Sequence, residues 1–195
     1  MIFEDDLRFL RRTIELADEA VANGNHPFGS LLVDASGEII GEGGNEFTID
    51  RGPGHAETNL ARRAARSFPL KVLRGATLYT SVEPCMMCAG TIYWAEIGSV
   101  VFGMTEKRLA ELTDGDDQNP TPDLDCRTVF ASGRNTTTVR GPFPELEADI
   151  VAQHAAFWNH KHDDRRRTHP PCPKGQLACC ASRSGGNRPA VRTNP

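Results

Sequence analysis

The chain has 195 residues, enough for one globular domain with a short additional segment. Its formal net charge of −4 argues against a nucleic-acid-binding surface over the whole protein, because proteins that bind polyanions are usually basic. No apolar run approaches the roughly 18 residues of a membrane span, and the acidic start lacks the basic and apolar regions of a signal peptide. We therefore expect a cytoplasmic protein without a membrane partner.

The first part of the sequence predicts a helix, a hairpin and a loop. Apolar residues recur at spacings of three and four from Leu7 to Val21, which is typical of an amphipathic helix that ends at Asn23-Gly24. Residues 28–33 and 38–43 predict two strands joined by a turn. Residues 44–54 contain Gly, Asn and Pro, and they predict a loop that leads into a helix over 56–67.

The second part alternates strands and helices. A strand over 77–82 feeds directly into a helix that closes at 91–95, and a strand over 99–103 and a brief helix over 106–112 follow. Residues 113–127 are acidic and Pro-rich, and a loop of this length is usually a functional lid or a disordered segment. A strand within 136–140 and a final helix complete a pattern that predicts an α/β fold with a sheet covered on both faces.

The composition changes sharply at residue 160. Charged residues come first and are followed by Pro, Gly, Ser and Cys without periodicity. We predict a folded domain over 1–159 and a disordered tail over 160–195. The run Arg165-Arg166-Arg167 lies in this tail, where a solvated charge run is its simplest interpretation.

Two short motifs carry the chemistry, His55-Ala56-Glu57 and Pro84-Cys85-Met86-Met87-Cys88. One imidazole and two thiolates suit zinc and leave its fourth tetrahedral position open to water. Glu57, left off the metal, can then move protons to and from that water. Such a set of residues is what a catalytic zinc site with a general acid and base requires.

The spacing of these residues predicts where they lie. Cys85 and Cys88 are three apart, so they face the same side of a helix. Pro84 suits the first position of that helix. The N-terminus of that helix favours thiolates. His55 and Glu57 are two apart and can share a site only where the backbone is not yet helical, so we place His55 near the N-cap of the 56–67 helix. Two helix N-termini should therefore meet over one zinc ion.

A C-x-x-C pair also occurs in structural zinc knuckles and in redox sites. A structural zinc site needs a fourth protein ligand, and no further Cys or His lies at a suitable short spacing. A redox pair would leave His55 and Glu57 without a role. The remaining cysteines have no zinc partner at a workable spacing and are treated as bystanders: Cys126, Cys172, Cys179 and Cys180.

The order H-x-E…P-C-x-x-C resembles the cytidine deaminase-like zinc superfamily, and the resemblance runs from about residue 3 to 158. The segments 26–30, 78–85 and 88–95 are most similar to its purine branch, which holds bacterial guanine deaminases and tRNA adenosine deaminases. The resemblance implies a three-layer α/β/α sandwich around a mixed five-stranded sheet, commonly as a homodimer.

The resemblance also implies the roles of the motif residues. His55, Cys85 and Cys88 would bind one Zn²⁺ per subunit. Glu57 would act as the proton shuttle between water, a ring nitrogen of the base and the leaving ammonia.

Substrate contacts implied by the same resemblance are spread along the chain. Phe28 would stack against the base and Asn45 would hydrogen-bond it, with Ala56 and the backbone N–H of Glu57 beside it. An ungapped count places a second acid at Asp116, although a solvated acidic loop would look the same. Aromatic residues would close the pocket: Trp94 from the Tyr93-Trp94-Ala95 triplet, and Phe157 and Trp158 from the last helix, where a core position is the commoner use of an aromatic pair. His26 and His154 are better interpreted as structural residues.

Three functions follow as hypotheses. The first is zinc-dependent deamination of a small purine, most simply guanine to xanthine, or of a nucleoside such as guanosine. The second is deamination of adenosine in tRNA, with cytosine or cytidine as a less favoured substrate; the acidic 113–127 segment and the overall charge argue against a nucleic-acid partner. The third, a non-catalytic zinc-stabilised binding domain, is disfavoured because such a domain has no need of Glu57.

Overall fold

The computed structural model describes the backbone of residues 2–113, 119–120 and 123–168. Internal contacts divide the chain at His160, and the packing described below is that of the part up to this residue. In chain order the elements are α1 (Ile2–Ala22), β1 (Gly29–Val33), β2 (Ile39–Gly44), α2 (Phe47–Asp50), α3 (Ala56–Ser67), α4 (Leu70–Gly75), β3 (Thr77–Val82), α5 (Met86–Trp94), β4 (Ser99–Met104), α6 (Glu106–Thr113), α7 (Cys126–Ala131), β5 (Thr138–Arg140) and α8 (Pro144–Thr168).

The sheet has five strands in the order β2-β1-β3-β4-β5. β1 runs antiparallel to β2 and to β3, whereas β4 is parallel to both β3 and β5. β3 is therefore a central strand, and its carboxyl end leads straight into α5. The predicted mixed five-stranded sheet is confirmed.

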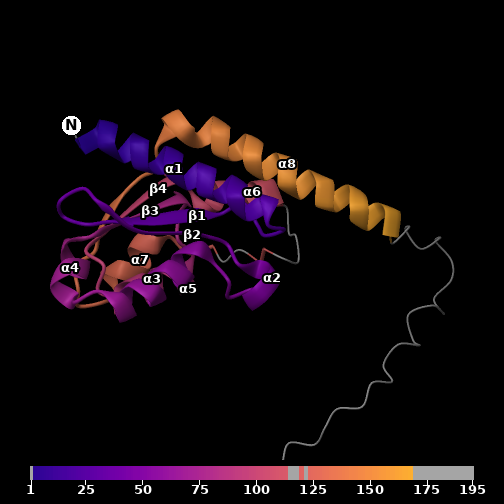
Figure 1. Ribbon diagram of the computed structural model, residues 1–195. Helices are drawn as coiled ribbons and strands as arrows, with labels where there is room; N and C mark the ends of the chain where they lie inside the picture. Colours follow the sequence, from indigo (N-terminus) through magenta and orange to yellow (C-terminus); the bar gives the residue numbers. More distant parts are fainter. Residues whose placement is uncertain (1, 114–118, 121–122, 169–195) are drawn as a thin grey trace, which may run out of the picture. The chain divides into compact units, whose positions relative to one another are not determined.

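Helices cover both faces of the sheet, with α1 on one face and α3, α5 and α7 on the other (Figure 1). A core cluster on the α1 face includes Leu10 of α1, Tyr79 of β3 and Ile150 of α8. The cluster on the opposite face includes Leu60 of α3 and Ile92 of α5. Strand residues alternate between the two faces, so this three-layer arrangement buries both sides of the central strands.

Most of the predicted elements are confirmed, and the helix Ala56–Ser67 and the strand Thr77–Val82 have the predicted bounds. The short helices α2, α4 and α7 were not predicted. α7 lies partly within the predicted acidic loop and begins after Asp125, whose carboxylate accepts a hydrogen bond from the N–H of Arg127 at 2.6 Å. A helix of six residues is too short to show a periodic pattern, and its N-cap is the one local signal.

One predicted boundary is wrong. α5 begins at Met86, with Cys85 as its N-cap in an extended conformation, so Pro84 precedes the helix and does not occupy its first position. α8 continues to Thr168, so the backbone is helical over the first residues of the segment predicted as a tail. The segment 160–168 contains no Gly or Pro, and the first Pro after it is Pro170. The remainder of the tail lies outside the described residues, so its disorder and the domain boundary stay predictions. None of the described helices is both long enough and apolar enough to cross a membrane.

Candidate metal centre and active site

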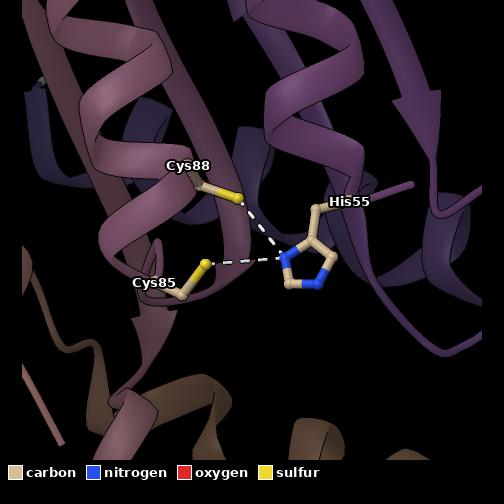
Figure 2. Close-up of side chains that lie close together, drawn as sticks. All are labelled: His55, Cys85 and Cys88. Carbon is tan, nitrogen blue, oxygen red and sulfur yellow. Dashed lines mark hydrogen bonds between the residues drawn. The ribbon is translucent and has the colours of Figure 1, made fainter. Parts of the chain in front are cut away.

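The two motifs meet at the N-termini of two neighbouring helices (Figure 2). His55 is the N-cap residue of α3 and Cys85 is the N-cap residue of α5, both with extended backbone conformations. Cys88 lies in the first turn of α5. The predicted meeting of two helix N-termini is therefore observed, and the non-helical backbone at His55 is what allows Glu57, two residues later, to face the same site.

The distances between the side chains fit a zinc ion. The Nδ1 atom of His55 lies 3.6 Å from Sγ of Cys85 and 3.4 Å from Sγ of Cys88. A tetrahedral zinc with ordinary zinc–sulfur and zinc–nitrogen bonds separates a sulfur and a nitrogen ligand by about 3.6 Å. Imidazole and thiolate are also the ligand types that zinc prefers. The ligand atoms of these three side chains lie within 4.8 Å of one another and could hold a metal ion.

The pKa values of the three candidate ligands are shifted by their burial and by one another. The hydrogen bond with Cys88 lowers the pKa of Cys85 to about 4, and His55 beside it acts in the same direction against burial. Burial raises the pKa of Cys88. Burial is the largest single influence on His55 and opposes its protonation, but the hydrogen bond with Cys85 and the charges of Cys85 and Glu57 together outweigh it and raise the pKa of the imidazole. These directions favour negative charge on Cys85 beside His55, and metal binding requires deprotonated thiols and a neutral imidazole, so a metal ion would displace protons from these groups.

Glu57 is buried beside the cysteines and makes two side-chain contacts. Its Oε1 accepts a hydrogen bond from Oγ1 of Thr80 at 2.7 Å. Its Oε2 lies 3.5 Å from Sγ of Cys88. Burial raises the pKa of Glu57. A raised pKa makes a carboxyl group a better proton acceptor than an exposed carboxylate, which suits a general acid and base.

Phe28, Asn45 and Ala56 surround the site in different ways. The ring of Phe28 lies parallel to that of His55, with an interplanar angle of 7° and 6.3 Å between ring centroids. Ala56 is fully buried as the first residue of α3. The side-chain oxygen of Asn45 accepts hydrogen bonds from the backbone N–H groups of Phe47 and His26, at 2.9 and 3.4 Å. The oxygen of Asn45 therefore has a structural task at the start of α2.

Trp158 lies in a buried aromatic cluster. Its Nε1–H donates to Nδ1 of His154 at 3.1 Å, and its ring lies 5.1 Å from that of His26. His154 in turn contacts Phe28 edge-on, at 5.0 Å. Trp158 is fully buried, as a core residue would be. His154 was expected to be a satisfied core residue, and it is buried, but its Nε2 has no hydrogen-bond partner among the described residues.

The structure does not bring Trp94 to the site. Trp94 ends α5, at the opposite end of the helix from Cys85, and 83% of its surface is exposed. Its neighbour Tyr93 is half-buried, and its hydroxyl oxygen accepts the N–H of Arg134 at 3.0 Å. A sequence motif cannot show which way a residue at the end of a helix faces, and here Trp94 points into solvent. Asp116 lies outside the described residues.

A pocket of about 590 Å³ with an acidic lining lies beside Glu83, at the start of the Pro-Cys motif. Its lining includes Glu83, Glu106, Lys107, Glu111, Asp123 and Asp125. Glu83 precedes Cys85 by two residues, and its carboxylate accepts the backbone N–H groups of Cys126 and Glu106 at 3.0 and 3.2 Å. Burial, with the charges of Cys85, Glu57 and Glu83, raises the pKa of Glu106 to about 9.

Sequence reasoning missed four of the polar residues around the motif: Thr58, Thr80, Glu83 and Glu106. Glu83 is adjacent to the Pro-Cys motif and could have been found by that position. The other three gave no local signal, because their contacts depend on how β3, α3 and α6 pack together.

Comparison with known proteins gives a consistent result. The family described as "Cytidine and deoxycytidylate deaminase zinc-binding region" matches residues 3–104. The chain is 33% identical over 156 residues to a probable cytosine deaminase of Schizosaccharomyces pombe, covering 80% of this chain and 94% of that protein. It is 41% identical over 110 residues to a tRNA-specific adenosine deaminase of Haemophilus influenzae, covering 56% of this chain and 64% of that protein.

A third relative is a guanine deaminase of Bacillus subtilis, 41% identical over 105 residues, which covers 53% of this chain and 67% of that protein. Among solved structures, a guanine deaminase from Nitrosomonas europaea matches with a TM-score of 0.56 and 22% identity, over 76% of this chain and 83% of that chain. At this identity, the structural match establishes a shared fold.

Proposed function

The chain belongs to the cytidine and deoxycytidylate deaminase zinc-binding family, and from this membership we propose that it hydrolyses the exocyclic amine of a free purine base. Guanine is the proposed substrate, and xanthine and ammonia are the products. The observation that carries the proposal is Glu57, a buried carboxyl group that lies beside the three metal-binding side chains and is not needed as a ligand.

A zinc ion held by His55, Cys85 and Cys88 would lower the pKa of a coordinated water from roughly 15.7 towards 7, which supplies the nucleophile at neutral pH. Glu57 moves the protons. Its Oε1 is held by Thr80, and its Oε2 faces the cysteines. In the proposed reaction Oε2 accepts one proton from water and delivers it to a ring nitrogen of the base as the oxygen bonds to the ring carbon. It then takes the second proton from the added hydroxyl group and delivers it to the amine, which leaves as ammonia as the C–N bond breaks and the carbonyl forms. Because burial raises the pKa of Glu57, the carboxyl group can retain the proton between these steps.

Phe28 and His55 offer a place for a flat heteroaromatic ring. A ring between two others needs about 7 Å between the outer planes, twice the optimal carbon–carbon contact. The observed centroid separation is 6.3 Å with the two planes almost parallel. The two planes are therefore at most 6.3 Å apart, and insertion of a base requires the half-buried Phe28 to move away from His55.

The charge of the pocket beside Glu83 supports a free base over a nucleic acid. A phosphodiester chain would meet Glu111, Asp123 and Asp125, and among the charged lining residues that the structure describes only Lys107 could attract it. Guanine, in contrast, presents hydrogen-bond donors, including the N2 amino group, which carboxyl oxygens can accept. The similarity to the Bacillus subtilis guanine deaminase supports the same substrate.

The deamination of adenosine in tRNA is the second candidate. It is favoured by the 41% identity to the Haemophilus influenzae enzyme over a similar stretch of the chain. Cytosine is a third substrate to include, because the Schizosaccharomyces pombe protein matches over nearly all of its length.

We also propose that two copies associate through α5. Met86 and Trp94 are 53% and 83% exposed, and helical periodicity places them with Gly90 and Tyr93 on one side of the helix. Several exposed or half-buried apolar residues gathered on one helix face, rather than a single one, support an interface between proteins.

The test of the proposed function is a substrate panel. Protein purified with one equivalent of zinc is incubated with guanine, guanosine, adenine, cytosine and a tRNA anticodon arm, and ammonia release is followed. We expect turnover with guanine, and a parallel sample stripped of zinc serves as the control. Release from the tRNA arm alone would establish the second candidate, and the absence of ammonia with every compound would contradict deamination altogether.

A further inference from the structure

Two buried threonine hydroxyls lie on either side of the contact between Glu57 and Cys88. Thr80 of β3 donates to Oε1 of Glu57 at 2.7 Å. Thr58 of α3 donates to Sγ of Cys88 at 3.3 Å. The two acceptors are themselves 3.5 Å apart, from Oε2 to Sγ. The four side chains are thus linked in the order Thr80, Glu57, Cys88 and Thr58, with a threonine hydroxyl donor at each end.

The position of Thr80 is fixed by the sheet. Its backbone pairs with Ser30 of β1 and with Phe102 of β4, so β3 is held on both sides at this residue. The side chain is fully buried. Thr80 lies on the same face of β3 as Leu78, which belongs to the core cluster packed against α3 and α5. A hydroxyl held in this way can fix the rotamer of the carboxyl group that it contacts.

Glu57 needs such a partner when the metal is bound. Among the described residues, Thr80 and Cys88 are the two other side chains that contact its carboxyl group. A thiol that binds a metal loses its proton and can no longer donate to Oε2. Thr80 then remains as the side-chain donor, and it leaves Oε2 free to face the reacting groups.

Thr58 acts on the metal ligand in the same way. Its hydroxyl reaches Sγ of Cys88 from the first turn of α3, and its side chain is buried. A thiolate in a dry interior requires hydrogen-bond donors, and groups that donate to a ligand orient it and influence how tightly the metal is held.

We propose that Thr80 and Thr58 are positioning residues with separate tasks. Thr80 holds Glu57 in its proton-transfer orientation, and Thr58 holds Cys88 in its metal-binding orientation. The task of Thr80 rests on the proposed deaminase function, whereas the task of Thr58 requires only that the site binds zinc.

The test uses Thr80→Val and Thr58→Val, which remove a hydroxyl at nearly constant shape, with Thr80→Ser and Thr58→Ser as variants that keep it. Thr13→Val is the matched control, because Thr13 is also fully buried but donates to the backbone of α1, at the carbonyl of Leu10. Each protein is loaded with zinc. We measure kcat and KM for guanine, and the loss of zinc to a competing chelator. Thermal melting confirms folding, and Thr80→Ala replaces Thr80→Val if the latter fails to fold.

We expect Thr80→Val to lower kcat by about 10- to 100-fold, with KM and zinc retention close to those of the wild type. Thr58→Val should weaken zinc retention by about 10-fold or more. Both Ser variants should restore the wild-type values, and Thr13→Val should change neither readout.

A kcat of Thr80→Val equal to that of Thr13→Val would overturn the task of Thr80, and wild-type zinc retention in Thr58→Val would overturn that of Thr58. Failure of the proposed function has a different signature. In that case the wild-type protein releases no ammonia, while the chelator assay still decides the task of Thr58.

Discussion

His154 is a histidine held neutral in the interior. Trp158 donates to its Nδ1, so the ring proton resides on Nε2, which has no partner in the described part of the chain. Burial, together with nearby His26, lowers the pKa of His154 from 6.5 to about 3. The unfolded chain therefore binds a proton at this residue between pH 6.5 and 3 while the folded chain does not. Stability supplied by the neutral ring is present above pH 6.5 and is lost as the pH falls.

His154→Gln should reduce this loss. The amide oxygen of Gln can accept the N–H of Trp158, and the side chain does not titrate. Between about pH 7 and pH 5, the unfolding free energy of the wild type should fall by about 2 kcal/mol more than that of the variant. Urea unfolding at the two pH values measures the difference. Equal losses in both proteins would show that His154 does not titrate with a lowered pKa.

Glu106 has the opposite behaviour with pH. Its pKa is raised from 4.5 to about 9, so the folded chain keeps a proton that the unfolded chain releases, and stability falls as the pH rises from 4.5 to 9. Glu106→Gln should therefore stabilise the protein at about pH 8, by about 2 kcal/mol. The gain is no larger than this because bound zinc offsets part of the charge of Cys85, which is one cause of the raised pKa. Glu111→Gln, at an exposed residue of the same pocket, is the control. An equal gain in stability at about pH 5 and at about pH 8 would contradict the raised pKa of Glu106.

At the scale of elements, α1 lies directly against β1. A Cβ atom on Gly29 would lie 2.1 Å from the carbonyl oxygen of Thr13 and 2.7 Å from the backbone nitrogen of Ala17. Backbone atoms cannot rotate away, so any side chain here must push α1 off the sheet. The absence of a side chain at Gly29 is therefore a condition for the helix layer that covers this face.

Gly29→Ala should cost about 3 kcal/mol or more of stability, since displacement of α1 opens the core beneath it. Gly52→Ala is the control, because its Cβ atom would meet nothing within 4 Å, and it should change stability by less than about 0.5 kcal/mol. Thermal and urea unfolding compare the two variants. A Gly29→Ala protein as stable as the Gly52→Ala protein would mean that α1 adjusts without cost.

The elements that could be predicted from sequence are those with a clear period or a local rule. The i, i+2 spacing of His55 and Glu57 predicted a position of His55 near a helix N-cap, since a helical pair at that spacing diverges, and His55 is the N-cap residue of α3. α7 was too short to show a period. Trp94 was expected at the substrate, but exposure is a property of the packed molecule. Thr80 could not be found for a related reason, because its partner Glu57 is on another element.

For the whole molecule, the exposed face of α5 predicts self-association. Trp94→Arg should weaken the association of two copies by at least about 10-fold, because aromatic residues at the centre of an interface contribute most of its binding energy. Ile49→Arg, at a 76% exposed apolar residue of α2, should leave it unchanged. Sedimentation velocity over a range of concentrations measures the effect. A wild-type protein that stays monomeric throughout would contradict this use of α5.

The central claim is that Glu57 transfers protons beside a zinc ion without binding it. The most direct measurement is ammonia release from guanine by Glu57→Gln, compared with the wild type at equal, measured zinc content. Gln preserves the shape of the side chain and its contact with Thr80 but cannot carry the proton. We predict one zinc per chain in both proteins and a loss of turnover of at least about 1,000-fold in the variant. Turnover within about 10-fold of the wild type at full zinc content would contradict the claim.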